Sequence, residues 1–413
     1  MSGDGGDGSS LLAWGLFARG LALVQAFALL DLSRQVLAFS GRRGIVPVHV
    51  TLRKLRAQLD RPALRWLYAP SLLWLSDSDA ALRGLALAGG AAGIAGALGL
   101  GGQSALWCLV AQLCLLSLDA AIGLGMPWDC LLLELGWLGA LLPPLPPVPA
   151  LAAAATPHPY VGWMCRWLLF RLIFGFGKLK FSGTDHASDQ LYIRDFMIMQ
   201  PIPTRLGWLM HVHGPLWLHR LLLGGMFVAE ILVPFLVFFE GWPRLLAAAV
   251  LVALQLGIQT HGNFGYFNVL TAVLCLPLLD AHASVFDPPP PNPTLLETWL
   301  VPPMLLLSGV GGAIHLAFAS GLTLSWSFLP VFVAWKSRSR RLIIEAFRAL
   351  QPFRIIHGYV SHRCARAALL PFASTTPEEL WLDACRSHSN HQRVMMAPRV
   401  CVRASSLPTP HPA

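Results

Sequence analysis

The sequence predicts an all-α membrane protein, a multi-pass bundle of about seven to nine transmembrane helices followed by a poorly ordered C-terminal tail. Hydrophobic residues make up 55% of the 413-residue chain, and charged residues make up only 12%, against about 25% in a typical soluble domain. The mean hydropathy is +0.58. The apolar residues gather in runs as long as a membrane-crossing helix, and short basic segments separate these runs.

The charge pattern points to lipid as a partner. The formal net charge is +9, and the Lys and Arg residues cluster in short loops between apolar runs. Cations in such loops set helix orientation and contact anionic lipid. We therefore expect membrane lipid as a partner and no nucleic acid.

Cysteine and histidine spacing predicts neither a metal site nor a redox site. No Cys-x-x-Cys spacing occurs, and His186, His211, His213 and His219 lack a carboxylate or cysteine at a recognised ligand spacing. No cofactor is expected. Five cysteines lie within apolar runs and are predicted to be reduced packing residues: Cys108, Cys114, Cys130, Cys165 and Cys275.

The apolar runs define a membrane domain over residues 11–335. Residues 1–10 are predicted to be disordered, and residues 11–30 to form a first span in which Arg19 pairs with a carboxylate. Residues 41–66 mix cations with apolar positions, and form either an interfacial amphipathic helix or a basic loop. Further spans are predicted at residues 83–100, 103–122, 128–142, 161–181, 218–239, 244–260, 264–280 and 302–335. A loop with short helical pieces covers residues 182–217.

The run 161–181 is apolar enough to cross a bilayer, yet it carries four cations. Arg171 and Lys178 are seven residues apart and share one helix face. A charge at membrane depth costs about 2.5 to 3.5 kcal/mol unless it is paired or reaches the surface. Asp129 and Glu134 in the preceding apolar run are the natural partners.

Two cations near the end of this run have separate interpretations. Lys180 is expected to reach the headgroups, since it points away from Lys178. Lys178 either forms an ion pair with Asp129 or Glu134, anchors the helix at the interface, or acts as a base in a dry site.

A polar stripe runs along the segment 244–263. Gln255, Gln259 and Asn263 follow one another at intervals of four residues, and Gly262 interrupts the helix. Buried amides of this kind hold neighbouring helices together or bind a polar ligand. The sequence leaves both alternatives open.

Several separate blocks, in order along the chain, resemble the lipase maturation factor family. The likeness covers roughly residues 11–360, and its blocks are Gly41–Pro47, Tyr68–Leu75, Trp128–Gly136, Arg166–Lys180, Gln200–Pro203, His219-Arg220 with Glu230 and Pro234, Gly262-Asn263 with Asn268–Thr271, and Pro352–Tyr359. The resemblance adds Gln200, Glu230, Asn263 and Asn268 to a polar core that already includes Asp129, Glu134, Arg171 and Lys178.

The resemblance implies a non-enzymatic multi-pass protein of the endoplasmic reticulum membrane. Family members assist the folding and assembly of secreted lipases, so the expected partners are client lipases and endoplasmic reticulum folding factors. The family is also distantly similar to the membrane domains of vitamin K-dependent carboxylases, which gives an alternative, a membrane enzyme with Lys178 as base.

The resemblance and the charge pattern differ on the C-terminal part. Family members continue into a lumenal β-rich domain, whereas similarity here fades after about Tyr359. Residues 336–413 are therefore expected to be a truncated or poorly structured segment. Basic residues at 42–65 and 336–348 favour the cytoplasm, but the resemblance implies a lumenal C-terminus, and the side of each loop stays open.

Overall fold

The computed structural model describes residues 4–59, 61–124, 126–182, 192–199, 204–284, 286–288, 295 and 297–306, without the side chains of residues 4–7, 178–179 and 181–182. All of these residues belong to one unit, Met1–Val360, and a second unit comprises Ser361–Ala413. Every regular element in the described ranges is a helix, which confirms the predicted all-α class. Most of the span predicted at 302–335 and all of segment 336–413 lie outside these residues.

Five helices in the described part are long and apolar enough to cross a membrane. They are Gly8–Ser40 within α1 (Asp4–Ser40), α4 (Asp79–Leu98), α5 (Ser104–Ile122), the continuous helix Leu216–Phe238, and α11 (Trp242–His261). The helix Leu216–Phe238 consists of α10 (Leu216–Phe227), a π-helical turn, η4 (Val228–Leu232), and a 3-10 segment, η5 (Val233–Phe238). α1 is longer than the span predicted at 11–30.

Two apolar helices are shorter than the spans predicted at 128–142 and 264–280. α6 (Pro127–Gly139) has 13 residues, which is about 20 Å of helix against a hydrocarbon core of about 30 Å. Leu131 and Leu135 on α6 are fully buried, so this helix fills the interior of the bundle. α12 (Phe267–Cys275) continues only into the short 3-10 turn η6 (Leu276–Leu279).

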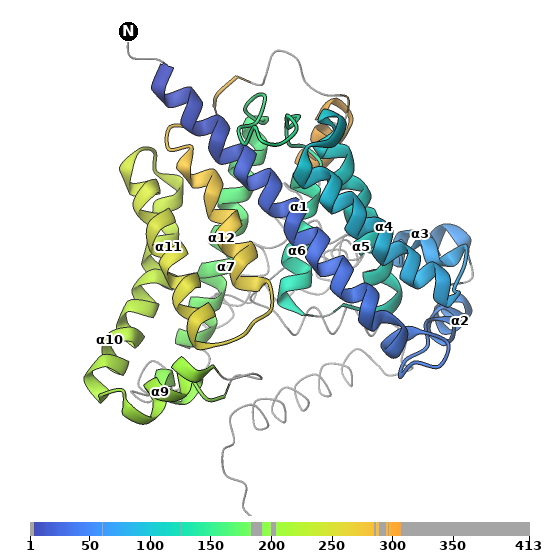
Figure 1. Ribbon diagram of the computed structural model, residues 1–413, viewed down its shortest axis with the longest axis horizontal. Helices are drawn as coiled ribbons and strands as arrows, with labels where there is room; N and C mark the ends of the chain where they lie inside the picture. Colours follow the sequence, from blue (N-terminus) through green and yellow to red (C-terminus); the bar gives the residue numbers. More distant parts are fainter. Residues whose placement is uncertain are drawn as a thin grey trace, which may run out of the picture. The chain divides into compact units, whose positions relative to one another are not determined.

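α1 is the helix around which the others pack. In Figure 1 it crosses between α12 on one side and α4 with α5 on the other. Glycines on α4 permit the closest of these contacts. A Cβ on Gly93 would lie 2.7 Å from the backbone nitrogen of Ala26, and one on Gly90 would lie 2.6 Å from Leu30. Small residues at these positions let the backbones of α1 and α4 approach each other closely.

The basic segment 41–66 is helical for most of its length. α2 (Val48–Gln58) buries Val48 and Leu52 against the bundle and exposes Arg53, Lys54 and Arg56. α3 (Pro62–Tyr68) follows, and the 3-10 turn η1 (Leu72–Trp74) leads into α4. The structure therefore favours the amphipathic helix over the basic loop.

The connecting segments gather at two ends of the bundle. At the end where α1 starts, Ala153 N donates to Leu11 O at 2.8 Å, and Trp14 Nε1 donates to Asp280 Oδ2 at 2.8 Å. At the opposite end, which we call the α2 end, lie α2, α3, and the loop between α11 and α12. Two short helices, α8 (Tyr192–Phe196) and α9 (Arg205–His213), adjoin this loop, since Thr204 Oγ1 donates to Thr260 O at 2.9 Å.

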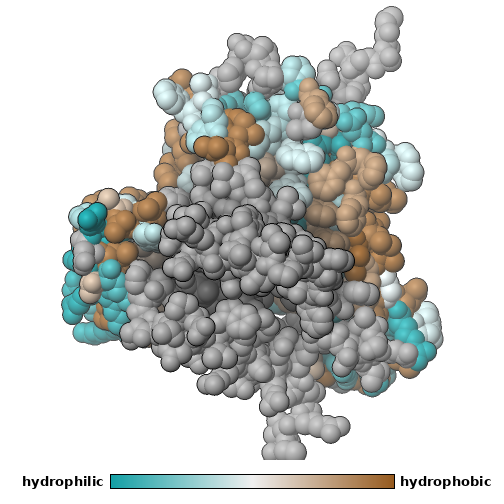
Figure 2. All heavy atoms as spheres, turned by 180° about the vertical axis from the view of Figure 1, so that it is seen from behind, coloured by the Kyte–Doolittle hydropathy of each residue, from teal (hydrophilic) through white to brown (hydrophobic). Residues whose placement is uncertain are grey.

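The outer faces of the long helices are apolar. Large side chains that lie exposed on them include Leu87 and Ile94 on α4, Leu113 on α5, Leu232 after α10, and Leu256 on α11. Figure 2 shows broad apolar areas on the visible surface, with hydrophilic residues toward its upper and lower ends. This distribution suits a surface surrounded by lipid.

Candidate functional site: charged and polar groups around α7

α7 (Pro159–Ser182) carries the cations that the sequence singled out, and it forms ion pairs with two neighbouring elements. Arg171 forms an ion pair with Glu134 on α6, and both side chains are at most 4% exposed. The guanidinium of Arg171 also lies 5.9 Å from the ring centre of Trp167. The expected pairing between the carboxylates of residues 128–142 and the cations of α7 is thus present for Glu134.

The second ion pair joins α7 to the π-helical turn. Lys180 Nζ lies 2.5 Å from Glu230 Oε1 and 3.8 Å from Met226 Sδ. Lys180, which was expected to reach the headgroups, thus has the buried carboxylate of Glu230 as its partner. Gly177 makes the contact possible, since a Cβ there would lie 2.8 Å from Glu230 Cβ and 2.9 Å from its carbonyl oxygen.

Tyr192 of α8 lies close to the same carboxylate. Burial, together with the negative charge of Glu230, raises the pKa of Tyr192 to about 12. The phenol is therefore neutral at physiological pH and keeps its proton for hydrogen bonding. Glu230 of the π-helical turn therefore interacts with both α7 and α8.

Two further polar contacts connect α6, α11 and α12. Tyr266 Oη donates to Asp129 Oδ1 at 2.5 Å, and Asn268 Nδ2 donates to Gln259 Oε1 at 2.9 Å. Asn263 differs from both, because it is exposed and its Oδ1 accepts from Gly265 N at 3.0 Å within the loop. The predicted polar stripe thus divides into a buried amide at Gln255, a half-buried amide at Gln259 and a turn residue at Asn263.

At the end where α1 starts, two buried arginines hold one backbone segment. Arg166 Nη1 donates to Ala283 O at 2.7 Å, and Arg244 Nη1 donates to the same oxygen at 2.9 Å. Arg244 also donates to Asp280 O at 3.0 Å, while the Asp280 side chain accepts from Trp14. These bonds tie α7 and α11 to the segment after η6.

Arg19 also donates to backbone carbonyls, so the prediction that it pairs with a carboxylate was wrong. Its guanidinium donates to three backbone carbonyls, those of Ala97, Pro146 and Ala150, at 2.5 to 2.6 Å. Carbonyl oxygens at helix ends and in proline-rich turns lack backbone partners, so a buried guanidinium with five donors can satisfy several at once.

A third polar cluster lies between α1, α5 and α6. Gln112 Nε2 donates to Leu133 O at 2.6 Å, and Cys108 Sγ donates to Gln25 Oε1 at 3.1 Å. A Cβ on Gly136 would lie 2.0 Å from Gln112 Oε1, so only glycine fits between the amide and the α6 backbone. All five cysteines predicted to be reduced packing residues are buried thiols.

The sequence missed Arg244, Tyr266, Gln25 and Gln112 as members of this network. A signal existed for the two glutamines, because each is an isolated polar residue in a long apolar run. Tyr266 lies between the glycine break and Asn268, where aromatic residues are common for packing alone. Arg244 follows Pro243 at the start of a helix, and this position looks like an interfacial anchor.

Some predicted positions lie outside the described residues. The side chain of Lys178, all of Gln200, and His186 belong to this group. Of the other histidines, His219 is buried and its Nδ1 contacts Pro215 O at 3.1 Å, while His211 Nδ1 contacts Arg194 O at 2.8 Å. Within the described part no group of three or more His, Cys, Asp or Glu residues is arranged to hold a metal ion.

Long apolar helices joined by buried charge pairs define a multi-pass helical membrane protein. The model of the lipase maturation factor transmembrane domain matches residues 12–286. The chain therefore belongs to the lipase maturation factor family, which confirms the resemblance seen in its motifs.

Three relatives show how far the similarity extends. Lipase maturation factor 1 of Mus musculus is 29% identical over 361 residues, which cover 83% of this chain and 61% of the relative. Lipase maturation factor 2 of Homo sapiens is 34% identical over 300 residues, 66% of this chain and 40% of the relative. Lipase maturation factor 2 of Gallus gallus is 35% identical over 275 residues, 64% of this chain and 38% of the relative. The chain spans less than two thirds of each relative, and no solved structure matches it.

Neither these matches nor the described residues support the carboxylase-like alternative. The charged groups around α7 whose side chains are described are held in ion pairs and hydrogen bonds. These groups hold neighbouring elements together, because each buried charge is satisfied by an opposite charge or by a backbone carbonyl.

Proposed function

We propose that this chain assists the maturation of secreted lipases, by folding and assembly, in the membrane of the endoplasmic reticulum. The observation that carries the proposal is the family match over residues 12–286, together with relatives named for lipase maturation. The partners are client lipases and folding factors of that compartment. The chain acts by binding and positioning, without a chemical step of its own.

The polar network gives this proposal a physical role for α7. Ion pairs from α7 to α6 and to the π-helical turn keep the bundle in one arrangement. A maturation factor needs such a fixed scaffold, because a client recognises a surface of constant shape. On this view Asp129, Glu134, Arg171, Glu230 and Asn268 maintain the client-binding arrangement, and the membrane domain extends over residues 11–335.

The test is complementation in cells that lack lipase maturation factors. The full chain is expressed with a secreted lipase, and the secreted lipase activity is measured against the amount of lipase synthesised. We expect the chain to locate to the endoplasmic reticulum and to raise secreted activity per lipase synthesised. Glu134→Ala should reduce this rescue, whereas Arg220→Gln, at an exposed position on α10, should retain it.

A negative outcome has a clear meaning. If the chain is present at normal abundance in the endoplasmic reticulum and secreted activity equals that of cells with empty vector, the proposal is wrong. A chain found in another membrane would contradict the proposed location independently of lipase activity.

A further inference from the structure

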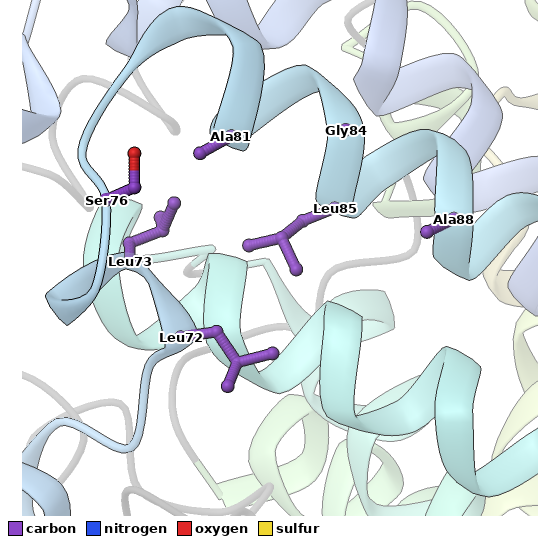
Figure 3. Close-up of a pocket in the computed structure, with 7 residues that line it drawn as sticks. All are labelled: Leu72, Leu73, Ser76, Ala81, Gly84, Leu85 and Ala88. Atoms are coloured by element: carbon purple, nitrogen blue, oxygen red, sulfur yellow. The ribbon is translucent and has the colours of Figure 1, made fainter.

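A groove of about 310 Å³ opens on the membrane-facing side of α4, next to η1. Six of its seven lining residues are apolar, and Ser76 is the polar one. Figure 3 shows Leu72 and Leu73 of η1 on one side of the groove and Leu85 of α4 on the other. Gly84 and Ala88 leave space between them because their side chains are small. The volume is at the low end of the range for ligand sites, about 300 to 1,000 Å³.

The groove starts at the α2 end and runs along a membrane span. Ser78 caps the N-terminus of α4, and the lining residues of α4 extend from Ala81 to Ala88. The helical rise from Ala81 to Ala88 is about 10 Å, which is about one third of a hydrocarbon core of about 30 Å. The polar residue Ser76 therefore lies near the membrane surface, and the apolar part of the groove lies in the acyl-chain region.

Cations lie beside η1 at the surface end of this groove. Arg56 lies 6.0 Å from the ring centre of Trp74, which belongs to η1. The exposed cations of residues 41–66 form a set that we call the basic collar: Arg42, Arg43, Arg53, Lys54, Arg56 and Arg61.

Few described carboxylates offset the collar. Asp77 and Asp79 are half-buried, and Asp79 Oδ1 accepts a hydrogen bond from Arg42 N at 2.7 Å. The η1 side of the surface end therefore carries positive charge, while the interior of the groove is apolar. A ligand that fits both parts has an anionic head and a hydrocarbon tail.

We propose that this groove binds an anionic glycerophospholipid. One acyl chain lies between η1 and α4, and the phosphate contacts Arg56. Each cation close to a membrane surface contributes about 1 kcal/mol of attraction to anionic lipid. A helix from a second copy of this chain fits less well, because two basic collars would then approach each other and repel.

The test measures which lipid stays with the purified full-length protein. The chain is reconstituted in nanodiscs of phosphatidylcholine with a minor fraction of phosphatidylserine, extracted in mild detergent, and analysed by native mass spectrometry. We expect phosphatidylserine to be enriched on the wild type, and Arg56→Gln to reduce its retention about fivefold. Gly84→Leu combined with Ala88→Leu should cause a similar loss by filling the groove.

Matched controls separate the groove from the rest of the surface. A Cβ on Gly84 meets no atom within 4 Å, and the same is true of Gly224 on the exposed face of α10. Gly224→Leu and Arg220→Gln therefore introduce the same changes elsewhere on the membrane-facing surface. Both should retain phosphatidylserine at the wild-type level.

Three results would overturn the proposal. One is equal retention of phosphatidylserine and phosphatidylcholine by the wild type. Another is retention that high salt leaves unchanged, because binding of a phosphate by exposed cations is screened by salt; this measurement needs no variant. The third is a wild-type dimer that Gly84→Leu converts to a monomer without loss of phosphatidylserine, which would assign the groove to a second copy.

Discussion

Glu134 and Arg171 lie where water cannot solvate them, and each side chain is at most 4% exposed. In such surroundings the attraction between the two charges offsets the cost of removing both from water only while both are present. Removal of one partner leaves an uncompensated charge in the interior, and this costs about 3 to 5 kcal/mol. The packing of α6 against α7 therefore depends on both members of this ion pair.

We expect Glu134→Ala to lower the thermal unfolding midpoint in detergent by many degrees, because Arg171 then stays charged in the interior. The double variant Glu134→Ala with Arg171→Met should lose less stability than the two single variants lose together. The reason is that no unpaired charge stays in the interior. Fluorescence-detected unfolding of the purified protein measures both effects.

Glu240→Ala is the matched control, because Glu240 is an exposed carboxylate on the same bundle. It should change the midpoint little. If the double variant loses as much stability as the two single variants together, Glu134 and Arg171 act independently. That result would contradict a stabilising ion pair between α6 and α7.

At the scale of elements, the contact between α7 and the π-helical turn depends on one missing side chain. Gly177 lies so close to Glu230 that an added Cβ would approach its Cβ, carbonyl carbon and carbonyl oxygen within 3.0 Å. A backbone this close cannot move aside as the end of a side chain can. The ion pair between Lys180 and Glu230 forms because the two elements approach this closely.

Gly177→Ala should destabilise the protein by about 1 to 3 kcal/mol, the usual cost of an overpacked contact. The control is Gly257→Ala on α11, where a Cβ meets nothing within 4 Å. That control should be neutral or stabilising, because alanine favours a helix by about 1 kcal/mol over glycine. If Gly177→Ala and Gly257→Ala shift the unfolding midpoint by the same amount, Gly177 is not a close-packing position.

The same scale shows what the sequence could predict. Runs of apolar residues located α4, α5 and α11 closely, because a membrane span leaves a long and simple signal. The pairing of Glu134 with α7 was also predictable, since few carboxylates occur in the apolar runs. α6 is shorter than its predicted span because burial inside the bundle and burial in lipid favour the same apolar residues.

Contacts to backbone atoms were beyond sequence reasoning. Arg19, Arg166 and Arg244 all donate to carbonyl oxygens, which every residue carries, so no residue type marks the partner. The ion pair of Lys180 was not predictable either, because its partner Glu230 lies 50 residues further along the chain. A long-range pair between two helices leaves no local pattern.

At the scale of the whole described bundle, the chain alternates between two ends, and this fixes which loops share a side of the membrane. Segments 99–103, 143–154 and 280–284 lie at the end where α1 starts, since Arg19, Trp14 and Arg244 bond to them or to residues beside them. Segments 41–78, 204–214 and 262–266 lie at the α2 end.

Glycosylation mapping tests this division, because an inserted acceptor site is modified only in the lumen. Acceptors inserted at residues 45 and 264 should behave alike, both modified or both unmodified, and acceptors at residues 101 and 282 should show the opposite behaviour. For each variant, the measured quantity is the increase in apparent mass that disappears after treatment with an N-glycosidase. If the acceptors at residues 45 and 264 differ, the alternation is wrong, because an odd number of the helices between them then crosses the membrane.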